Sequence, residues 1–256
     1  MIGLLKAEIT KLTGRKLYPV MVLIIMIFTG FTGFFLMILA QIFEGAASEG
    51  VPVIEKPDAY FLGIQQVVGQ TWFPLILAVV ILGGELASTI WATTLTRESR
   101  KTSQIAARLI VFTVASWVAM LIGIAVWAVM AASFAEGTGG PALSEWLNVL
   151  WKVGMSQLAW VSLGIGFVAL LRSVGPAIGA VIAMSFGEGL LVLWRPYQNV
   201  SLTGASTGIF GSFGLDGIAS LFMPAPVGTL HAVAIIVGWT GLGLLLTWWG
   251  LNRRDA

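Results

Sequence analysis

The chain has 256 residues, of which 57% are hydrophobic and only 10% carry a charge. Soluble globular domains are about 25% charged, so the composition excludes a soluble protein and indicates one that crosses a membrane several times. The formal net charge of +2 is small, and the absence of cysteine excludes disulfides, thiolate metal sites and a cysteine nucleophile.

Residues 1–16 predict an amphipathic helix. Ile2, Leu5, Ile9 and Leu12 recur at helical spacing, which places them on one face. Basic residues occupy much of the remaining surface, as in helices that lie in the membrane interface. We therefore expect an interfacial helix here. The alternative is a basic segment that simply precedes the first span.

Six apolar segments follow, each close to the length of about 20 residues that a spanning helix needs. They are predicted at residues 18–43, 60–84, 105–133, 147–171, 174–194 and 228–250. Only Arg172 and Ser173 separate the fourth span from the fifth, so these two should form a tight antiparallel pair. The expected fold class is all-α, a polytopic membrane protein whose single transmembrane domain covers residues 1–256.

Lysine and arginine residues counted by loop predict the orientation of the chain. With the N-terminus inside, the outer segments contain Lys56, Lys152 and Arg195, and every other cation falls on the inner side. Cations collect in the cytoplasmic loops of membrane proteins. Both termini are therefore expected in the cytoplasm. The protein is expected in the cell membrane, with a bacterial cytoplasmic membrane favoured.

A hydrophilic island, Glu85–Arg108, separates the second span from the third. It carries Arg97, Arg100 and Lys101, and no glycine or proline interrupts it. This pattern predicts a short helix at the cytoplasmic membrane surface. A surface segment there, at residues 85–104, could receive a displacement from a soluble partner and pass it to the spans.

The largest outer segment, residues 195–227, is rich in glycine and moderately apolar. Gly208, Gly211, Gly214 and Gly217 recur at every third position. Two interpretations fit this pattern equally. The segment either re-enters the membrane, where non-helical backbone must be buried in protein or line a cavity, or it forms a glycine-rich surface loop.

The sequence lacks the motifs of an enzyme. No phosphate-binding loop of the form GxxxxGK[ST] occurs, so the chain is not expected to bind ATP itself. His231 is the single histidine, which excludes a multi-histidine metal site within one chain. We therefore expect a non-catalytic membrane protein with no metal and no cofactor of its own.

Three polar residues fall in the outer parts of the predicted spans: Lys152, Glu188 and His231. A charge at membrane depth is costly, so such residues usually pair with one another or face water. One hypothesis is that the three line an outward cavity or gate. The alternative is structural: an ion pair between Glu188 and Lys152, or a Lys152 side chain that extends to the surface.

Small residues in the last two spans predict close helix packing. Gly175 and Gly179 form a GxxxG pattern in the fifth span, and Gly241 and Gly243 lie in the sixth. Patterns of this kind let helices approach closely. The contact could lie within the chain or between chains.

Short motifs occur at three places along the chain. They are an ExxKLxxRK stretch at residues 8–16, a series of Glu, Thr, Leu-Thr and Arg at positions 85, 89, 95–96 and 100, and a terminal Arg254-Asp255 after an aromatic sixth span. In their order and placement these motifs resemble the permeases of ABC exporters of the ABC-2 type.

The resemblance implies a membrane subunit that pairs with a second permease chain, identical or related. It also implies two cytoplasmic ABC ATPase subunits, which would hold ATP and Mg²⁺. In that family the segment after the second span docks onto the ATPase, and the N-terminal helix braces it. The residues implied in coupling are Glu85, Thr89, Thr94, Thr96, Arg97, Glu98, Ser99 and Arg100.

The expected function is therefore export of an apolar or amphipathic substrate, such as a drug, a peptide or a lipid-like molecule. Membrane lipids are expected partners and nucleic acid is not. Two other classes remain open. One is a gradient-driven transporter or channel with Glu188 as a proton carrier, and the other is a membrane scaffold that transports nothing.

Overall fold

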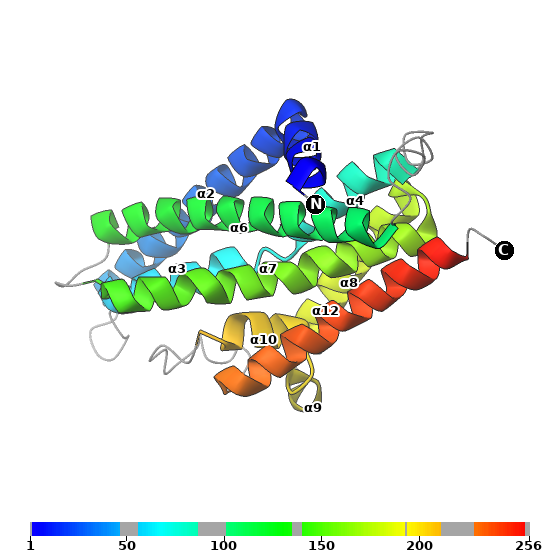
Figure 1. The fold of residues 1–256 in the computed structure, drawn as a ribbon. Helices are drawn as coiled ribbons and strands as arrows, with labels where there is room; N and C mark the ends of the chain where they lie inside the picture. Colours follow the sequence, from blue (N-terminus) through cyan, green and yellow to red (C-terminus); the bar gives the residue numbers. More distant parts are fainter. Residues whose placement is uncertain are drawn as a thin grey trace.

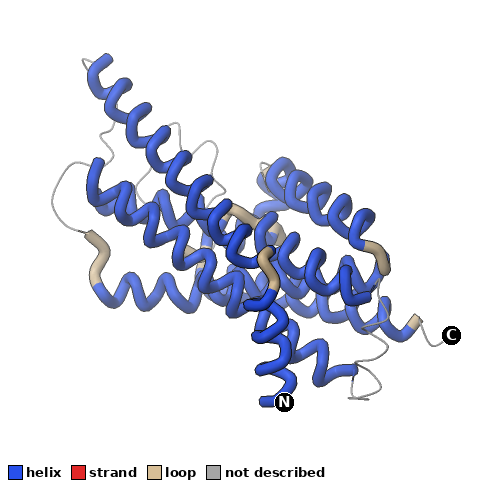
Figure 2. Tube along the Cα trace, turned by 90° about the horizontal axis from the view of Figure 1, so that it is seen from above, coloured by secondary structure: helices blue, strands red, loops and turns tan. Residues whose placement is uncertain are grey.

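The structure is a computed structural model that describes residues 2–46, 56–86, 101–134, 140–192, 194–210 and 228–253. In these ranges all regular secondary structure is helical (Figure 2). The helices are α1 (Ile2–Gly14), α2 (Leu17–Ala46), α3 (Lys56–Val68), α4 (Trp72–Leu86), α6 (Lys101–Phe134), α7 (Leu143–Leu171), α8 (Val174–Leu191), α9 (Arg195–Gln198), α10 (Leu202–Gly208) and α12 (Thr229–Asn252).

Six described segments are long and apolar enough to cross a membrane, as in a multi-pass membrane protein. The all-α class is therefore confirmed, and each of the six predicted spans corresponds to a helical segment of suitable length and apolarity. The tight turn is also confirmed, because α7 ends at Leu171 and α8 begins at Val174. Arg172 makes this turn possible by adopting the left-handed conformation, with φ of 57°, in which its N–H bonds back to the carbonyl of Val168.

The second span is not the single continuous helix that the sequence predicted at residues 60–84. Gly69, Gln70 and Thr71 interrupt it between α3 and α4. The break is tied to the first span, because Gln70 Nε2 donates to Thr29 Oγ1 at 3.1 Å. Non-helical backbone at this depth is tolerated when it is buried in protein, and both Gln70 and Thr29 are buried.

Helix α7 occupies the centre of the bundle. It contacts α4, α6, α8 and α12, and Figure 1 shows α6 on one side of it and α12 on the other. The window of α7 that could span a membrane is 72% buried, whereas those of α2, α8 and α12 are 22%, 17% and 22% buried. These three helices present their apolar side chains outward, as lipid-facing helices do.

Helices α7 and α12 approach each other closely, and this contact depends on glycine. A Cβ added at Gly243 would lie 2.5 Å from the carbonyl carbon of Ser162, and one at Gly250 would lie 2.6 Å from that of Ala169. No side chain fits at such distances, so the backbones themselves are in contact. By contrast, no atom of the described ranges lies within 4 Å of a Cβ built at Gly175, Gly179 or Gly241.

Candidate functional site

Five charged side chains from three helices meet at the ends of α4 and α6. We call this group the ion network; its members are Glu8, Lys11 and Arg15 in or just after α1, Glu85 in α4 and Arg108 in α6. It lies at the end of the bundle where α1 packs against α6 (Figure 1). Two carboxylates face three cations in it.

Glu85 and Arg108 form the buried centre of the ion network. Arg108 Nη2 donates to Glu85 Oε2 at 2.6 Å, and each of the two residues is only 1% exposed. Arg15 Nη2 lies 3.2 Å from Glu85 Oε1. Charge-assisted bonds of this kind are strong, and losing one partner leaves a buried charge uncompensated.

Glu8 connects the N-terminal helix to the same centre. Its Oε1 accepts from Lys11 Nζ at 2.9 Å and lies 3.5 Å from Arg108 Nε. Lys11 Nζ also lies 3.6 Å from Glu85 Oε1. Helix α1 is thus attached by ion pairs to both helices that flank the predicted coupling segment.

Helix α1 forms over the predicted amphipathic segment, and the face that it packs against the bundle is not the one that carries Ile2 and Ile9. Leu12 is buried, but Ile2 and Ile9 are 85% and 50% exposed, and the other buried residue of α1 is Glu8. The reason is electrostatic: the helix turns its carboxylate toward the buried guanidinium of Arg108. The exposed isoleucines leave an apolar edge available to a membrane surface.

Of the eight residues implied in coupling, Glu85 is the one that the structure describes, and it lies in the ion network. The other seven lie outside the described residues: Thr89, Thr94, Thr96, Arg97, Glu98, Ser99 and Arg100. The sequence did not predict the ion network itself. The available signal was a charge in each of three predicted helix ends that share one side of the membrane.

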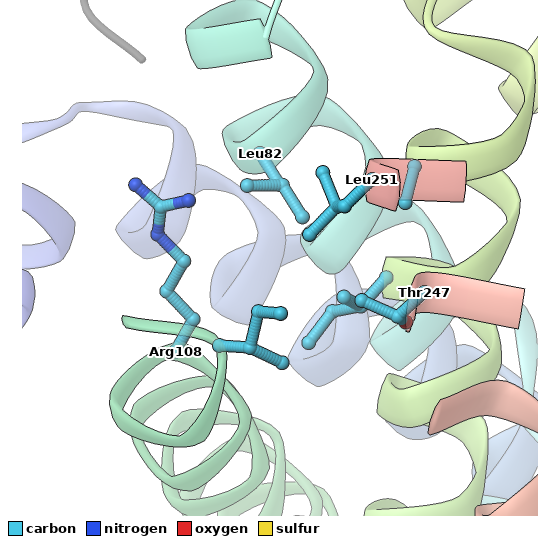
Figure 3. A pocket seen from close by; sticks show the side chains of 7 residues that line it. Leu82, Arg108, Thr247 and Leu251 are labelled. Atoms are coloured by element: carbon cyan, nitrogen blue, oxygen red, sulfur yellow. The ribbon is translucent and has the colours of Figure 1, made fainter. Parts of the chain in front are cut away.

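A small hollow lies beside the ion network, between the ends of α4, α6, α7 and α12 (Figure 3). Its lining comprises Leu82, Ile105, Arg108, Ile165, Ala169, Thr247 and Leu251. It offers about 10 Å³ to the centre of a water molecule, which is close to the minimum that one water needs. This hollow is too small to hold a drug or a lipid.

Glu188 forms a second polar centre, far along the chain from the first. The carboxylate is 3% exposed and accepts hydrogen bonds from the Tyr197 hydroxyl, from Ser201 Oγ at 2.8 Å and from the N–H of Thr203 at 3.0 Å. Burial, and then the bond to Glu188, raises the pKa of Tyr197. Glu188 thereby fixes the start of α10 to the end of α8.

Lys152 does not pair with Glu188. Within the described residues it has no ion pair and no hydrogen bond; its Nζ instead lies 5.8 Å from the ring centre of Phe210 and 5.9 Å from that of Trp151. The side chain is 8% exposed, so it does not extend to the surface. The described chain therefore shows neither the predicted ion pair between Glu188 and Lys152 nor a Lys152 side chain that extends to the surface.

The three predicted polar residues share a neighbour although they do not contact one another. Each touches the α9–α10 segment, residues 194–210: Glu188 at its start, Lys152 at Phe210, and His231 through its Nε2, which lies 3.0 Å from the carbonyl oxygen of Asn199. Glu188 and Lys152 are buried, whereas His231 is exposed.

Two tryptophans hold the same segment against the middle of long helices. Trp239 of α12 donates to the carbonyl of Val200 at 2.8 Å, and Trp160 of α7 donates to Ser206 Oγ at 3.3 Å. Of the predicted outer segment 195–227, the described part thus packs among the spans rather than looping away from them. Residues 211–227 lie outside the described chain.

Comparison with protein families and with curated proteins found no match. No protein-family model matches the chain, and no curated protein is significantly similar to it.

Proposed function

We propose that this chain is the membrane-spanning subunit of an ATP-driven exporter of the ABC-2 type. The observation that carries the proposal is the ion network. It ties the N-terminal helix to Glu85 and Arg108, which flank the segment that the sequence assigns to coupling. A force applied to residues 87–100 would act on α4 and α6 together.

The ion network would transmit that force as a rigid unit. Glu85 and Arg108 are held at 2.6 Å with almost no exposure, so α4 and α6 cannot separate at this end without breaking a buried ion pair. The ATPase partners would bind ATP and Mg²⁺ and favour one arrangement of the spans over another. Such a switch needs only a difference in affinity between two states.

A second permease chain, identical or related, would complete the transporter. The fifth span supports this step, because Gly175 and Gly179 of α8 are exposed and no described atom lies within 4 Å of a Cβ added at either position. A GxxxG pattern without a neighbour among the described residues suits contact with another helix. The termini would be cytoplasmic, and the substrate apolar or amphipathic.

The first test is the identity of the partner. The chain, purified in mild detergent from its native membrane, should carry with it a protein with a phosphate-binding loop and ATPase activity. The variant Glu85→Gln should lose most of that protein, while Lys6→Gln, an exposed cation of α1 outside the ion network, should retain it. Recovery of the chain with partners that lack ATPase motifs would exclude the proposal.

The second test is orientation, and the absence of native cysteine makes it direct. An impermeant maleimide added to intact cells should label Leu143→Cys at the predicted outer end of α7 and should leave Arg97→Cys unlabelled. Both should react after the cells are opened. Labelling of Arg97→Cys from outside would place the coupling segment on the wrong side of the membrane.

A gradient-driven transporter is the second candidate, and Glu188 favours it. The carboxylate is buried and, within the described chain, is bonded to hydroxyl and N–H donors instead of a cation. Buried carboxylates in membrane proteins often carry protons. Transport that continues without any ATPase and stops with an uncoupler would select this candidate.

A further inference from the structure

One face of α7 carries buried polar groups at a spacing of four residues. Lys152, Ser156 and Trp160 follow one another along this face, and their exposed fractions are 8%, 0% and 0%. The hydroxyl of Ser156 has no hydrogen-bond partner in the described chain. A polar stripe therefore runs along α7, the central helix of the bundle.

Helix α10 and the residue pair after it cover this stripe. Ser206 accepts from Trp160 Nε1, and Phe210, four residues further on, presents its ring to Lys152. Both covering residues are buried. The α9–α10 segment thus lies along the polar face of α7, while Glu188 holds its beginning from α8.

The buried charge of Lys152 has a cost that no carboxylate in the described chain offsets, and two ring contacts, at 5.9 Å and 5.8 Å, compensate it only in part. Lys152 meets two aromatic rings and no carboxylate, and Glu188 is committed to Tyr197, Ser201 and Thr203. A methionine at position 152 would fill similar space without a buried charge. A charge kept at such a place in a membrane protein indicates a ligand that compensates it.

We propose that Lys152 binds the acidic head group of the transported molecule once α10 has moved off α7. The proposal rests on the proposed export function and narrows its substrate to an amphipathic anion, a single phosphate or carboxylate on an apolar chain. With Phe210 withdrawn, one cation beside the Trp151 ring of the same helix suits one acidic group and an apolar tail. Ser156 would supply a hydrogen bond to the same group.

Binding of a defined probe tests the inference without any partner protein. Native mass spectrometry of the purified chain, released from a neutral maltoside detergent, counts bound dodecyl phosphate. Dodecyl trimethylammonium and inorganic phosphate are the comparison ligands. We expect one dodecyl phosphate per chain, weaker binding of free phosphate and no specific binding of the cationic amphiphile.

Variants then assign the site. Lys152→Gln should weaken dodecyl phosphate binding by about tenfold or more, the usual effect of losing a charged hydrogen bond. Lys152→Arg should retain binding, and so should Arg195→Gln, which removes an exposed cation from α9. Glu188→Gln should strengthen binding several-fold, because it loosens the cover.

Thermal stability provides a second, independent readout. Lys152→Met should raise the melting temperature if the cation is uncompensated, and should lower it if a carboxylate of the chain neutralises it. The latter result, or equal binding of dodecyl phosphate by Lys152→Gln and the parent, overturns the inference. Because no ATPase takes part, failure here leaves the exporter proposal standing, and loss of the ATPase partner leaves this inference standing.

Discussion

Arg108 and Glu85 are 23 positions apart in the sequence, and their side chains meet at 2.6 Å with each residue 1% exposed. The contact closes a loop that contains the whole predicted coupling segment. It fixes the distance between the helix that enters that segment and the helix that leaves it. Arg15, just after α1, also attaches to α4 by donating to the backbone carbonyl of Ile81 at 3.2 Å.

Breaking the buried pair should cost much more than removing an exposed charge. Glu85→Gln and Arg108→Met should each lower the free energy of unfolding by about 3–5 kcal/mol, the usual penalty for leaving one buried charge uncompensated. The double variant should lose less than the sum of the two. Denaturation in mixed micelles measures all three, and additive losses would show that the residues do not interact.

Glu188→Gln should release the α9–α10 segment while leaving the bundle folded. The three donors share two carboxylate oxygens in the parent, whereas the amide of the variant has one acceptor oxygen. The free energy of unfolding should therefore fall by about 1–3 kcal/mol. Ser206→Cys reports the release, since position 206 is fully buried in the parent. A maleimide should label it much faster in the Glu188→Gln background, with exposed Val200→Cys as the control that reacts in both.

Alanine at two glycines of neighbouring spans should give opposite results. Gly243→Ala forces a methyl group to within 2.5 Å of the α7 backbone and should destabilise the protein by about 1–3 kcal/mol. In the single chain, Gly179→Ala meets no described atom within 4 Å and should be neutral or slightly stabilising to the monomer in detergent, because alanine is the better helix former. Melting temperatures of the purified variants compare them, and an equal loss at both positions would contradict the packing described.

Alkaline pH should weaken the protein through Tyr197. Burial, and then the hydrogen bond to Glu188, raises the pKa of this hydroxyl above the ordinary tyrosine value of 10.0. When folding raises the pKa of a phenol, the contribution of that group to stability is fully present below the unfolded pKa. It is lost as the pH rises from the unfolded pKa through the folded pKa. Between about pH 8 and about pH 11 the parent should therefore lose more melting temperature than Tyr197→Phe. If the melting temperatures of the parent and of Tyr197→Phe fell equally with pH, ionisation of Tyr197 would not be linked to folding.

The spans could be predicted from sequence because membrane burial imposes a local signal. Long apolar segments and the Arg172–Ser173 turn identify α2, α6, α7, α8 and α12 without reference to any neighbour. The interruption at Gly69–Thr71 gave a weaker signal. Gln70 dilutes the hydrophobicity there, but its bond to Thr29 on another helix is what accommodates a break.

The polar contacts could not be predicted from the sequence, because they depend on which helix faces pack against one another in the fold. Glu188 and Lys152 lie at similar distances from the predicted outer surface, which suggested an ion pair. The fold instead inserts α10 beside them, and each makes contact with that helix or its flanks. Likewise, α1 buries Glu8 beside Arg108, a residue about a hundred positions away, and the spacing of apolar residues within α1 gives no sign of this contact.

The interruption of the second span divides it into two parts with separate anchors. Helix α4 ends in the ion network, whereas α3 is held by Trp127 of α6, whose Nε1 donates to the carbonyl of Ala59 at 2.8 Å. A continuous helix would carry any tilt of its inner end to its outer end as a lever does. Residues 69–71 interrupt that continuity, so a tilt of α4 at the ion network is not carried rigidly into α3.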